Sequence, residues 1–361
     1  MKQKSNRAAN FELLKIFAIF LVVSAHYMDK GGVLPHTTGA ISVTGNIAWL
    51  VEAVCFCSIN AFVLVSGYFA PKQEGFKFGK VISFYLELLF YSLLVGVIAI
   101  IAGVVPRETL SLYELLKIVF PISTEQYWFA NAYLIVLCIS PFLNAGIRSL
   151  TQKQFRNVLF VLLFFFSVVK TVVPIKMNYD NGGNNALWLI IVYLVGAYIA
   201  MYWQDKFKSK KLCLLLYAGF TVLIFLTNVA LRAFNMATGK LGASLSYAYS
   251  HNHLFTLMAA VMIFCFFRNL SIPDGKLAKI IKVLSGGTLG VYLIHEHCYI
   301  RYEWQEWLGV QKFTDTPLFL VHMLLCVTMI FLVCTGIDII RQKLFRIPEK
   351  WYANRKQKKE N

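Results

Sequence analysis

Long apolar runs recur along the chain and are separated by short polar segments. A helix needs about 20 mostly apolar residues to cross the hydrocarbon core of a bilayer, and the polar breaks recur too often for soluble domains joined by linkers. The pattern predicts an all-α integral membrane protein with about ten transmembrane helices. The expected spans cover residues 11–28, 46–69, 82–104, 127–146, 157–174, 186–203, 212–234, 254–267, 283–300 and 318–340.

Lysine and arginine are distributed unevenly between the two sets of connections. The connections on the side that holds both chain termini carry 25 of these residues, and those on the other side carry nine. Because short cytoplasmic loops are enriched in Lys and Arg, we expect both termini in the cytoplasm. We expect one transmembrane domain over residues 1–345 and a solvated basic tail over residues 346–361.

The composition agrees with this interpretation. Hydrophobic residues make up 58% of the chain and charged residues 15%, with a mean hydropathy of +0.61. The net charge of +17 would suit a nucleic-acid partner, but the basic residues lie between apolar runs instead of clustering on soluble elements. We therefore expect membrane lipid around the protein and no nucleic-acid partner.

The cysteines do not indicate a metal site. Seven of the eight lie inside apolar runs without the spacing of metal ligands, and these are Cys55, Cys57, Cys138, Cys213, Cys265, Cys326 and Cys334. We interpret them as small buried apolar residues and expect no metal.

The first apolar run has an alternative interpretation as a signal peptide. Small residues (VSA) precede His26, where a peptidase would require them. However, Glu12 and Lys15 interrupt the apolar stretch, and nine further spans follow it. A retained first helix is the better interpretation.

This first run carries a lysine and a histidine on one helical face. In KIFAIFLVVSAH, eleven steps separate Lys15 from His26. An α-helix turns by about 100° and rises by about 1.5 Å per residue, so these eleven steps make about three turns. The two residues are then separated by roughly 16 to 17 Å along the helix axis. Glu12 precedes Lys15 by three residues and can pair with it.

Each of these side chains also has an ordinary explanation. Lys15 alone fits a side chain that extends to the lipid headgroups, and His26 alone fits an interfacial residue bonded to Asp29. Ionisable groups inside a membrane domain usually face a polar cavity, however, and histidine is well suited to accept a proton near neutral pH. Both interpretations stand on these residues alone.

Four blocks of the sequence, in matching order, resemble the membrane acyltransferase 3 family. In its first span that family has arginine followed after ten residues by histidine, similar to Lys15 and His26 here. The other blocks are CSINAFVLVSGYF (57–69), YWFANAYLIVLCISPFLN (127–144) and LGVYLIHEH (289–297). The resemblance covers essentially the whole chain. The family includes bacterial enzymes that O-acetylate cell-surface polysaccharides.

The resemblance implies an acyltransferase of the plasma (inner) membrane that crosses it several times. Its co-substrate would be acetyl-CoA or another acyl-CoA, and its acceptor a glycan or lipid-linked sugar. His26 would act as the general base that removes a proton from a sugar hydroxyl. Asp29 or Glu52 would orient the His26 ring.

The resemblance also implies a site for the phosphates of the donor. Lys15 stands where the family usually has arginine, Glu12 stands where many members have aspartate, and Lys77 and Lys80 stand in place of a pair of arginines. Lysine keeps the charge but lacks the bidentate geometry of a guanidinium group. Ser66 is expected to allow helix packing or to line the donor path.

Several polar and aromatic residues near the predicted outer side are candidates for acceptor binding. The aromatic ones also fit the belt of Trp and Tyr found at membrane interfaces, and the histidines and the amide also fit packing roles. These candidates are Tyr127, Trp128, Asn131, His295 and His297.

The alternative function is a transporter or flippase for a lipid-linked glycan or another small molecule, since helices with intramembrane charges suit that class too. Motifs of soluble enzymes do not fit, because the chain has neither a GxSxG elbow nor a Walker loop. The Lys15 and His26 pair on one continuous helix favours the acyltransferase.

Overall fold

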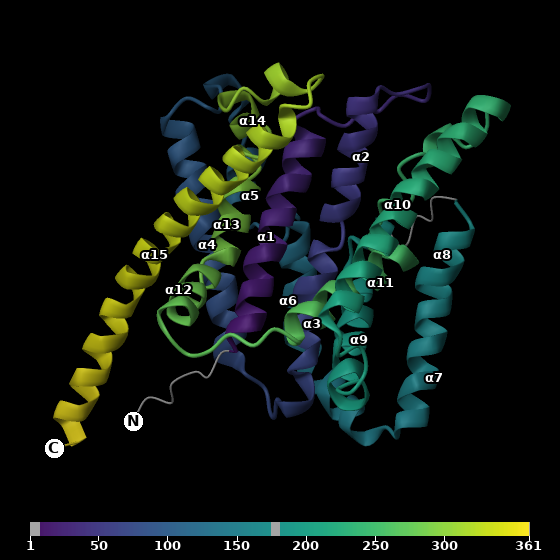
Figure 1. Cartoon of the computed structure of the whole chain (residues 1–361). Helices are drawn as coiled ribbons and strands as arrows, with labels where there is room; N and C mark the ends of the chain where they lie inside the picture. The colour runs from purple at the N-terminus through teal and green to yellow at the C-terminus, as the bar shows by residue number, and fades with distance from the viewer. Residues whose placement is uncertain (1–7, 175–180, 361) are drawn as a thin grey trace.

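The computed structural model describes residues 8–174 and 181–360, which are 75% helical and contain no strand. The helices stand side by side in a bundle (Figure 1). They are α1 (Ala9–Lys30), α2 (Val43–Cys55), α3 (Ser58–Tyr68), α4 (Phe78–Ile101), α5 (Leu112–Val119), α6 (Trp128–Ser149), α7 (Gln152–Leu163), α8 (Val169–Val172), α9 (Ala186–Tyr202), α10 (Lys210–Thr238), α11 (Leu254–Arg268), α12 (Lys276–Ser285), α13 (Thr288–His295), α14 (Glu303–Trp307) and α15 (Phe319–Glu360).

Within the described residues, eight helical segments are long and apolar enough to cross a membrane, and two shorter apolar helices, α9 and α11, accompany them. Each of the ten predicted ranges overlaps one of these ten segments. The start of α1 and the end of α15 lie at the same side of the bundle (Figure 1). The all-helical membrane fold is confirmed, while the number of spans and the cytoplasmic location of the termini stay predictions.

Four of the basic residues counted for orientation lie outside the described residues, and these are Lys2, Lys4, Arg7 and Lys176. At the other end of the chain, α15 continues through the predicted tail as far as Glu360. The boundary that we placed at residue 345 therefore does not coincide with a break in the helix.

Helix α1 lies at the centre of the bundle. It contacts α2, α3, α11, α12, α13 and α15, and 61% of its most apolar window is buried inside the protein. A helix in this position exposes little of its surface to lipid. Its ionisable residues therefore face other helices or internal cavities.

Two spans are interrupted instead of continuous. Phe56 and Cys57 separate α2 from α3, and Gly286 and Gly287 separate α12 from α13. The second interruption changes the expected span at 283–300, because the helical segment begins at Lys276 and ends at His295. The lysines of α12 make this helix look polar in the sequence. Two of them, Lys276 and Lys279, are exposed outside the core.

Glycine residues let α3 and α9 approach closely. A Cβ atom at Gly67 would lie 2.0 Å from the backbone oxygen of Tyr193, and one at Gly196 would lie 2.5 Å from that of Leu64. Larger residues would push the helices apart, as in other membrane interfaces built from small residues. This contact fixes the α3 face that lines the site described next.

Candidate functional site

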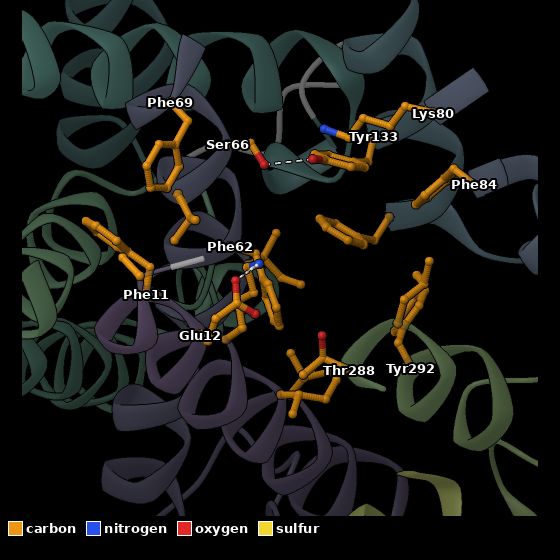
Figure 2. A pocket seen from close by; sticks show the side chains of 18 of the residues that line it. Phe11, Glu12, Phe62, Ser66, Phe69, Lys80, Phe84, Tyr133, Thr288 and Tyr292 are labelled. Carbon is orange, nitrogen blue, oxygen red and sulfur yellow. Dashed lines mark hydrogen bonds and ion pairs between the residues drawn. The ribbon is translucent and has the colours of Figure 1, made fainter. Parts of the chain in front are cut away.

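One face of α1 lines two cavities in succession. The first, which we call the lysine cavity, has a volume of about 600 Å³ (Figure 2). Its wall includes Glu12, Lys15, Ser66 and Lys80, four of the five residues expected at the donor site. The fifth, Lys77, precedes α4 and is exposed outside this wall.

The walls of the lysine cavity are mostly aromatic and aliphatic. The apolar lining residues include Phe11, Ile19, Phe62, Val65, Phe84 and Phe129. The cations lie toward one end, since Lys15 occupies the first half of α1 and Lys80 the first turn of α4. Such a cavity suits a long ligand with a charged head and a less polar arm.

Hydrogen bonds hold the polar side chains of the lysine cavity. The Lys15 Nζ donates to Glu12 Oε1 at 2.9 Å, and Glu12 Oε2 accepts from the Ser285 hydroxyl. The hydroxyl groups of Ser66 and Tyr133 lie 2.7 Å apart (Figure 2). Ser66 therefore lines the cavity, while its neighbour Gly67 provides the close packing.

The second cavity, which we call the histidine cavity, has a volume of about 390 Å³. Its lining contains many more ionisable groups, and they include His26, Asp29, Lys30, Glu52, Glu296 and Arg301. The His26 side chain retains 20% of its accessible surface, whereas His295 and Glu296 are almost fully buried. Among these three side chains, the His26 ring is thus the most accessible.

The two cavities adjoin within the bundle. Val22, Ile59 and Tyr292 line both of them. On α1, Lys15 and Val22 line the lysine cavity, and Val22 and His26 line the histidine cavity. The shared face expected for Lys15 and His26 therefore leads from one cavity into the other.

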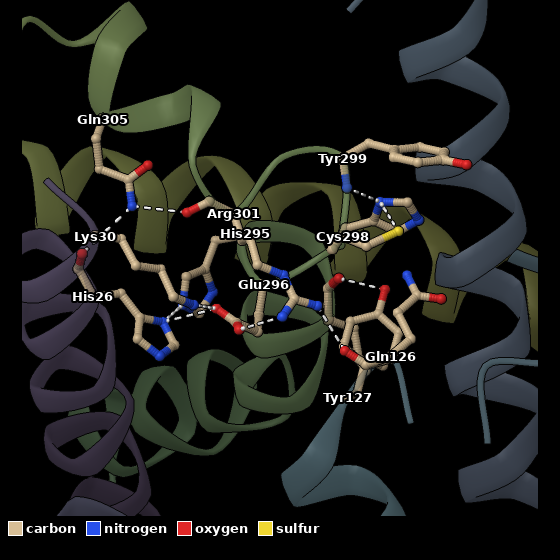
Figure 3. A network of polar contacts seen from close by, with 12 residues as sticks. His26, Lys30, Gln126, Tyr127, His295, Glu296, Cys298, Tyr299, Arg301 and Gln305 are labelled. Atoms are coloured by element: carbon tan, nitrogen blue, oxygen red, sulfur yellow. Dashed lines mark hydrogen bonds and ion pairs between the residues drawn. The ribbon is translucent and has the colours of Figure 1, made fainter. Parts of the chain in front are cut away.

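His26 is held by two residues at the end of α13 (Figure 3). Its Nδ1 lies 2.9 Å from His295 Nε2 and 3.1 Å from Glu296 Oε2. The Nδ1 of His295 lies 2.6 Å from the backbone oxygen of Val291. A backbone carbonyl only accepts hydrogen bonds, so His295 carries its proton on Nδ1 and presents an acceptor at Nε2.

This network determines the tautomer of His26. Both partners of its Nδ1, His295 Nε2 and the Glu296 carboxylate, are acceptors, so Nδ1 carries the proton. The other ring nitrogen, Nε2, then has a free lone pair. This assignment leaves His26 with an acceptor on the ring atom that is not held by α13.

Glu296 connects this cluster to two cations (Figure 3). Lys30 donates to its Oε2, and Arg301 Nη1 lies 3.4 Å from its Oε1. Glu296 follows the last residue of the span, and burial alone would raise the pKa of its carboxyl group. The contact with His26 and the positive charges of Lys30 and Arg301 outweigh burial and lower that pKa to about 2.

The same cluster offers three atoms that could ligate a metal, because the ligand atoms of His26, His295 and Glu296 lie within 4.8 Å of one another. The carboxylate already pairs with Lys30 and Arg301, however. A further cation beside these two would be repelled. The arrangement favours a hydrogen-bonded triad.

The two carboxylates expected to orient His26 lie elsewhere in the histidine cavity. Asp29 Oδ1 is 3.4 Å from His36 Nε2, and both side chains are more than half exposed. Glu52 is 3% exposed and lines the cavity wall. Among the described contacts of the His26 ring nitrogens, His295 and Glu296 occupy the orienting position instead.

Of the expected acceptor residues, Trp128 lies at this site, and His295 contacts the His26 ring without lining either cavity. Trp128 lines the histidine cavity and stacks on His251 with ring centroids 5.5 Å apart. The other three lie outside the lining of both cavities. Their polar atoms make structural hydrogen bonds: Tyr127 to the Leu293 oxygen, Asn131 to the Ile122 oxygen, and His297 to the Ser92 oxygen.

Several residues of the site were not expected from the sequence, and they include Lys30, Tyr292, Glu296 and Arg301. Lys30 follows His26 by four residues, so the helical repeat could have placed it on the same face. Glu296 stands between two histidines in the block LGVYLIHEH. Arg301 carried no comparable signal, because it reaches the site only through the turn that follows α13.

These features define a helical membrane protein with two adjoining cavities inside its bundle. A model of the acyltransferase 3 family, described as an acyltransferase domain, matches residues 9–338. The chain belongs to this family. No curated protein and no solved structure matches the chain.

Proposed function

We propose that the protein is an O-acyltransferase that moves an acyl group, acetyl in the simplest case, from cytoplasmic acyl-CoA to a hydroxyl of a cell-surface glycan or its precursor. The observation that supports this most directly is the single face of α1 that carries Lys15 in the lysine cavity and His26 in the histidine cavity. Donor and acceptor then approach His26 from opposite sides.

The lysine cavity is the proposed donor site. Lys15 and Lys80 attract the phosphates of CoA, and the apolar walls accept the pantetheine arm. The distance of roughly 16 to 17 Å along α1 from Lys15 to His26 corresponds to the part of the donor between its phosphates and its thioester. Glu12 reduces the net charge near Lys15, so Lys80 supplies the less compensated cation.

His26 is the proposed general base. Its free Nε2 takes the proton of the acceptor hydroxyl as the oxygen attacks the thioester carbon. The carbon–sulfur bond breaks, and the proton passes from His26 to the CoA thiolate. Glu296 stabilises the positive charge that His26 carries between these steps, the role that a buried carboxylate plays in a serine protease triad.

The histidine cavity suits an acceptor rich in hydroxyl groups. Four lining residues have a buried polar atom without a hydrogen-bond partner among the described residues, and these atoms are Trp49 Nε1, Glu52 Oε2, Asn184 Oδ1 and Arg301 Nε. Such groups normally find partners. Because they include both donors and acceptors, sugar hydroxyls, which also do both, suit them.

Transport of a lipid-linked glycan is the second candidate. It is favoured by the interruptions between α2 and α3 and between α12 and α13, since transporters often use broken helices around a central site. The continuous α1, which carries both key side chains, favours the acyltransferase.

The test is turnover of radiolabelled acetyl-CoA by the purified wild type and by His26→Ala, with thermal unfolding of both. His322→Gln is a matched control, because His322 lies outside the walls of both cavities. We expect turnover by the wild type and His322→Gln and its loss in a folded His26→Ala protein. Equal turnover by His26→Ala would contradict the role of His26. Absence of turnover and of acetyl-CoA-dependent stabilisation in the wild type would favour transport.

A further inference from the structure

The two cavities meet at three side chains that belong to both walls. Val22, Ile59 and Tyr292 are 5%, 6% and 5% exposed, so neighbouring side chains cover most of their surface and leave little of it open to either cavity. We call these three residues the junction. They come from α1, α3 and α13, three helices in mutual contact through α1.

The junction lies one helical turn from the reacting histidine. Val22 precedes His26 by four residues on α1, and Tyr292 precedes His295 by three on α13, so each pair shares a face of its helix. The rings of Tyr292 and His295 have centroids 6.3 Å apart. On α3, Ile59 is the lining residue at the end of a row that continues through Phe62, Ser66 and Phe69 in the lysine cavity.

The acyl group of a donor bound in the lysine cavity has to lie at the junction. Its carbonyl carbon must come within reach of a hydroxyl beside His26 Nε2, while the CoA phosphates stay near Lys15 and Lys80. The remaining carbons of the acyl chain then occupy the space that Val22, Ile59 and Tyr292 leave. Densely packed walls resist even one additional methylene group.

We infer that the junction sets the acyl-chain length of the donor and restricts it to short acyl groups, with Val22 and Ile59 as the residues that determine specificity. This inference rests on the proposed function. It assigns to these two side chains a selectivity that is independent of how tightly CoA itself binds, because the phosphates and the pantetheine arm contact other parts of the lysine cavity.

The experiment compares kcat/KM for acetyl-, propionyl- and butyryl-CoA in the wild type, Val22→Ala and Ile59→Ala. Each substitution removes carbon atoms from the junction, and a methylene in an apolar pocket changes discrimination by about 10 to 200-fold. We expect the ratio of butyryl to acetyl kcat/KM to rise at least about tenfold in each variant. Ile59→Val is a milder variant for use if Ile59→Ala does not fold. It should raise the ratio of propionyl to acetyl kcat/KM.

Val65→Ala is the matched control for Val22→Ala. Val65 is as buried as Val22, at 4%, but it lines only the lysine cavity. We expect this control to change the values for acetyl- and butyryl-CoA by the same factor, so that their ratio stays that of the wild type.

An unchanged ratio in folded Val22→Ala, Ile59→Ala and Ile59→Val proteins would overturn the inference while the wild type still turned over acetyl-CoA. An equal rise in Val65→Ala would overturn it as well, because the selectivity would then reside in the whole lysine cavity. Failure of the wild type to turn over any of the three donors would contradict the proposed function, and the inference would fall with it.

Discussion

The lysine cavity and the histidine cavity lie on the same face of α1 but differ in chemistry. The first has aromatic and aliphatic walls with cations toward one end, and the second is lined by histidines, carboxylates, a lysine and an arginine. Apolar walls can hold a long arm in place, whereas groups that move protons require charged and hydrogen-bonding partners. One central helix thus carries a binding region and a reactive region in sequence.

The largest expected effect is that of His26→Ala, which should impair the reactive region and leave the binding region intact. Replacing His26 with Ala removes the proposed base and should lower kcat by about 10² to 10⁴-fold. Binding of acetyl-CoA, measured by calorimetry, should stay close to that of the wild type, because His26 lies outside the wall of the lysine cavity. A variant that lost donor binding together with turnover would show that the two cavities do not act separately.

The next effect concerns Glu296, which belongs to the histidine cavity alone. Glu296→Gln keeps the shape but removes the charge that stabilises protonated His26 and pairs with Lys30 and Arg301. We expect kcat to fall by about 10²-fold or more, with little change in KM for acetyl-CoA. Steady-state kinetics with a thermal-unfolding control will measure this. A change confined to KM would contradict the proposed role.

The next effect concerns donor binding in the lysine cavity and compares Lys80 with Lys77. Lys80 lines the wall and Lys77 does not, so Lys80→Ala should raise KM for acetyl-CoA by about tenfold, the loss of one charge-assisted contact. Lys77→Ala should change it less. Kinetics at several salt concentrations will compare them, since the Lys80 contribution should weaken with added salt. Equal effects in both variants would point to a diffuse surface attraction.

The smallest expected effect concerns Trp128, which lines the histidine cavity and stacks on His251. Trp128→Phe keeps an aromatic face but loses part of the stacking area, and we expect a several-fold rise in KM for the acceptor, of the order of 1 kcal/mol. The KM for acetyl-CoA should not change. Transfer of label to an envelope polysaccharide extract at varied extract concentration will measure both. A change in the donor KM alone would place Trp128 with the other region.

The sequence predicted what lies within a single helix and missed much of what depends on helix packing. Eleven steps along a regular α-helix place Lys15 and His26 on one face, and the structure has both on cavity walls. The partners of His26 come from α13, 269 positions further along the chain for His295. No local pattern specifies which helices meet across such a distance.

The two histidines of LGVYLIHEH illustrate this limit. His295 is the last residue of α13 and contacts His26, while His297 lies in the following turn and contacts the Ser92 backbone on α4. Helical spacing applies to His295 and not to His297, so the sequence alone does not show that the two histidines point to different places. The same holds for Tyr127, whose neighbour Trp128 lines the histidine cavity and which itself hydrogen-bonds to Leu293.

The central claim is that the donor reaches His26 from the lysine cavity and the acceptor from the histidine cavity. The most direct measurement uses proteoliposomes of known protein orientation, with radiolabelled acetyl-CoA on the side of the lysine cavity and an envelope polysaccharide extract on the other side. We predict labelled polysaccharide with the wild type and none with His26→Ala. Labelling that requires donor and extract on the same side, or movement of unmodified polysaccharide across the bilayer, would contradict the account.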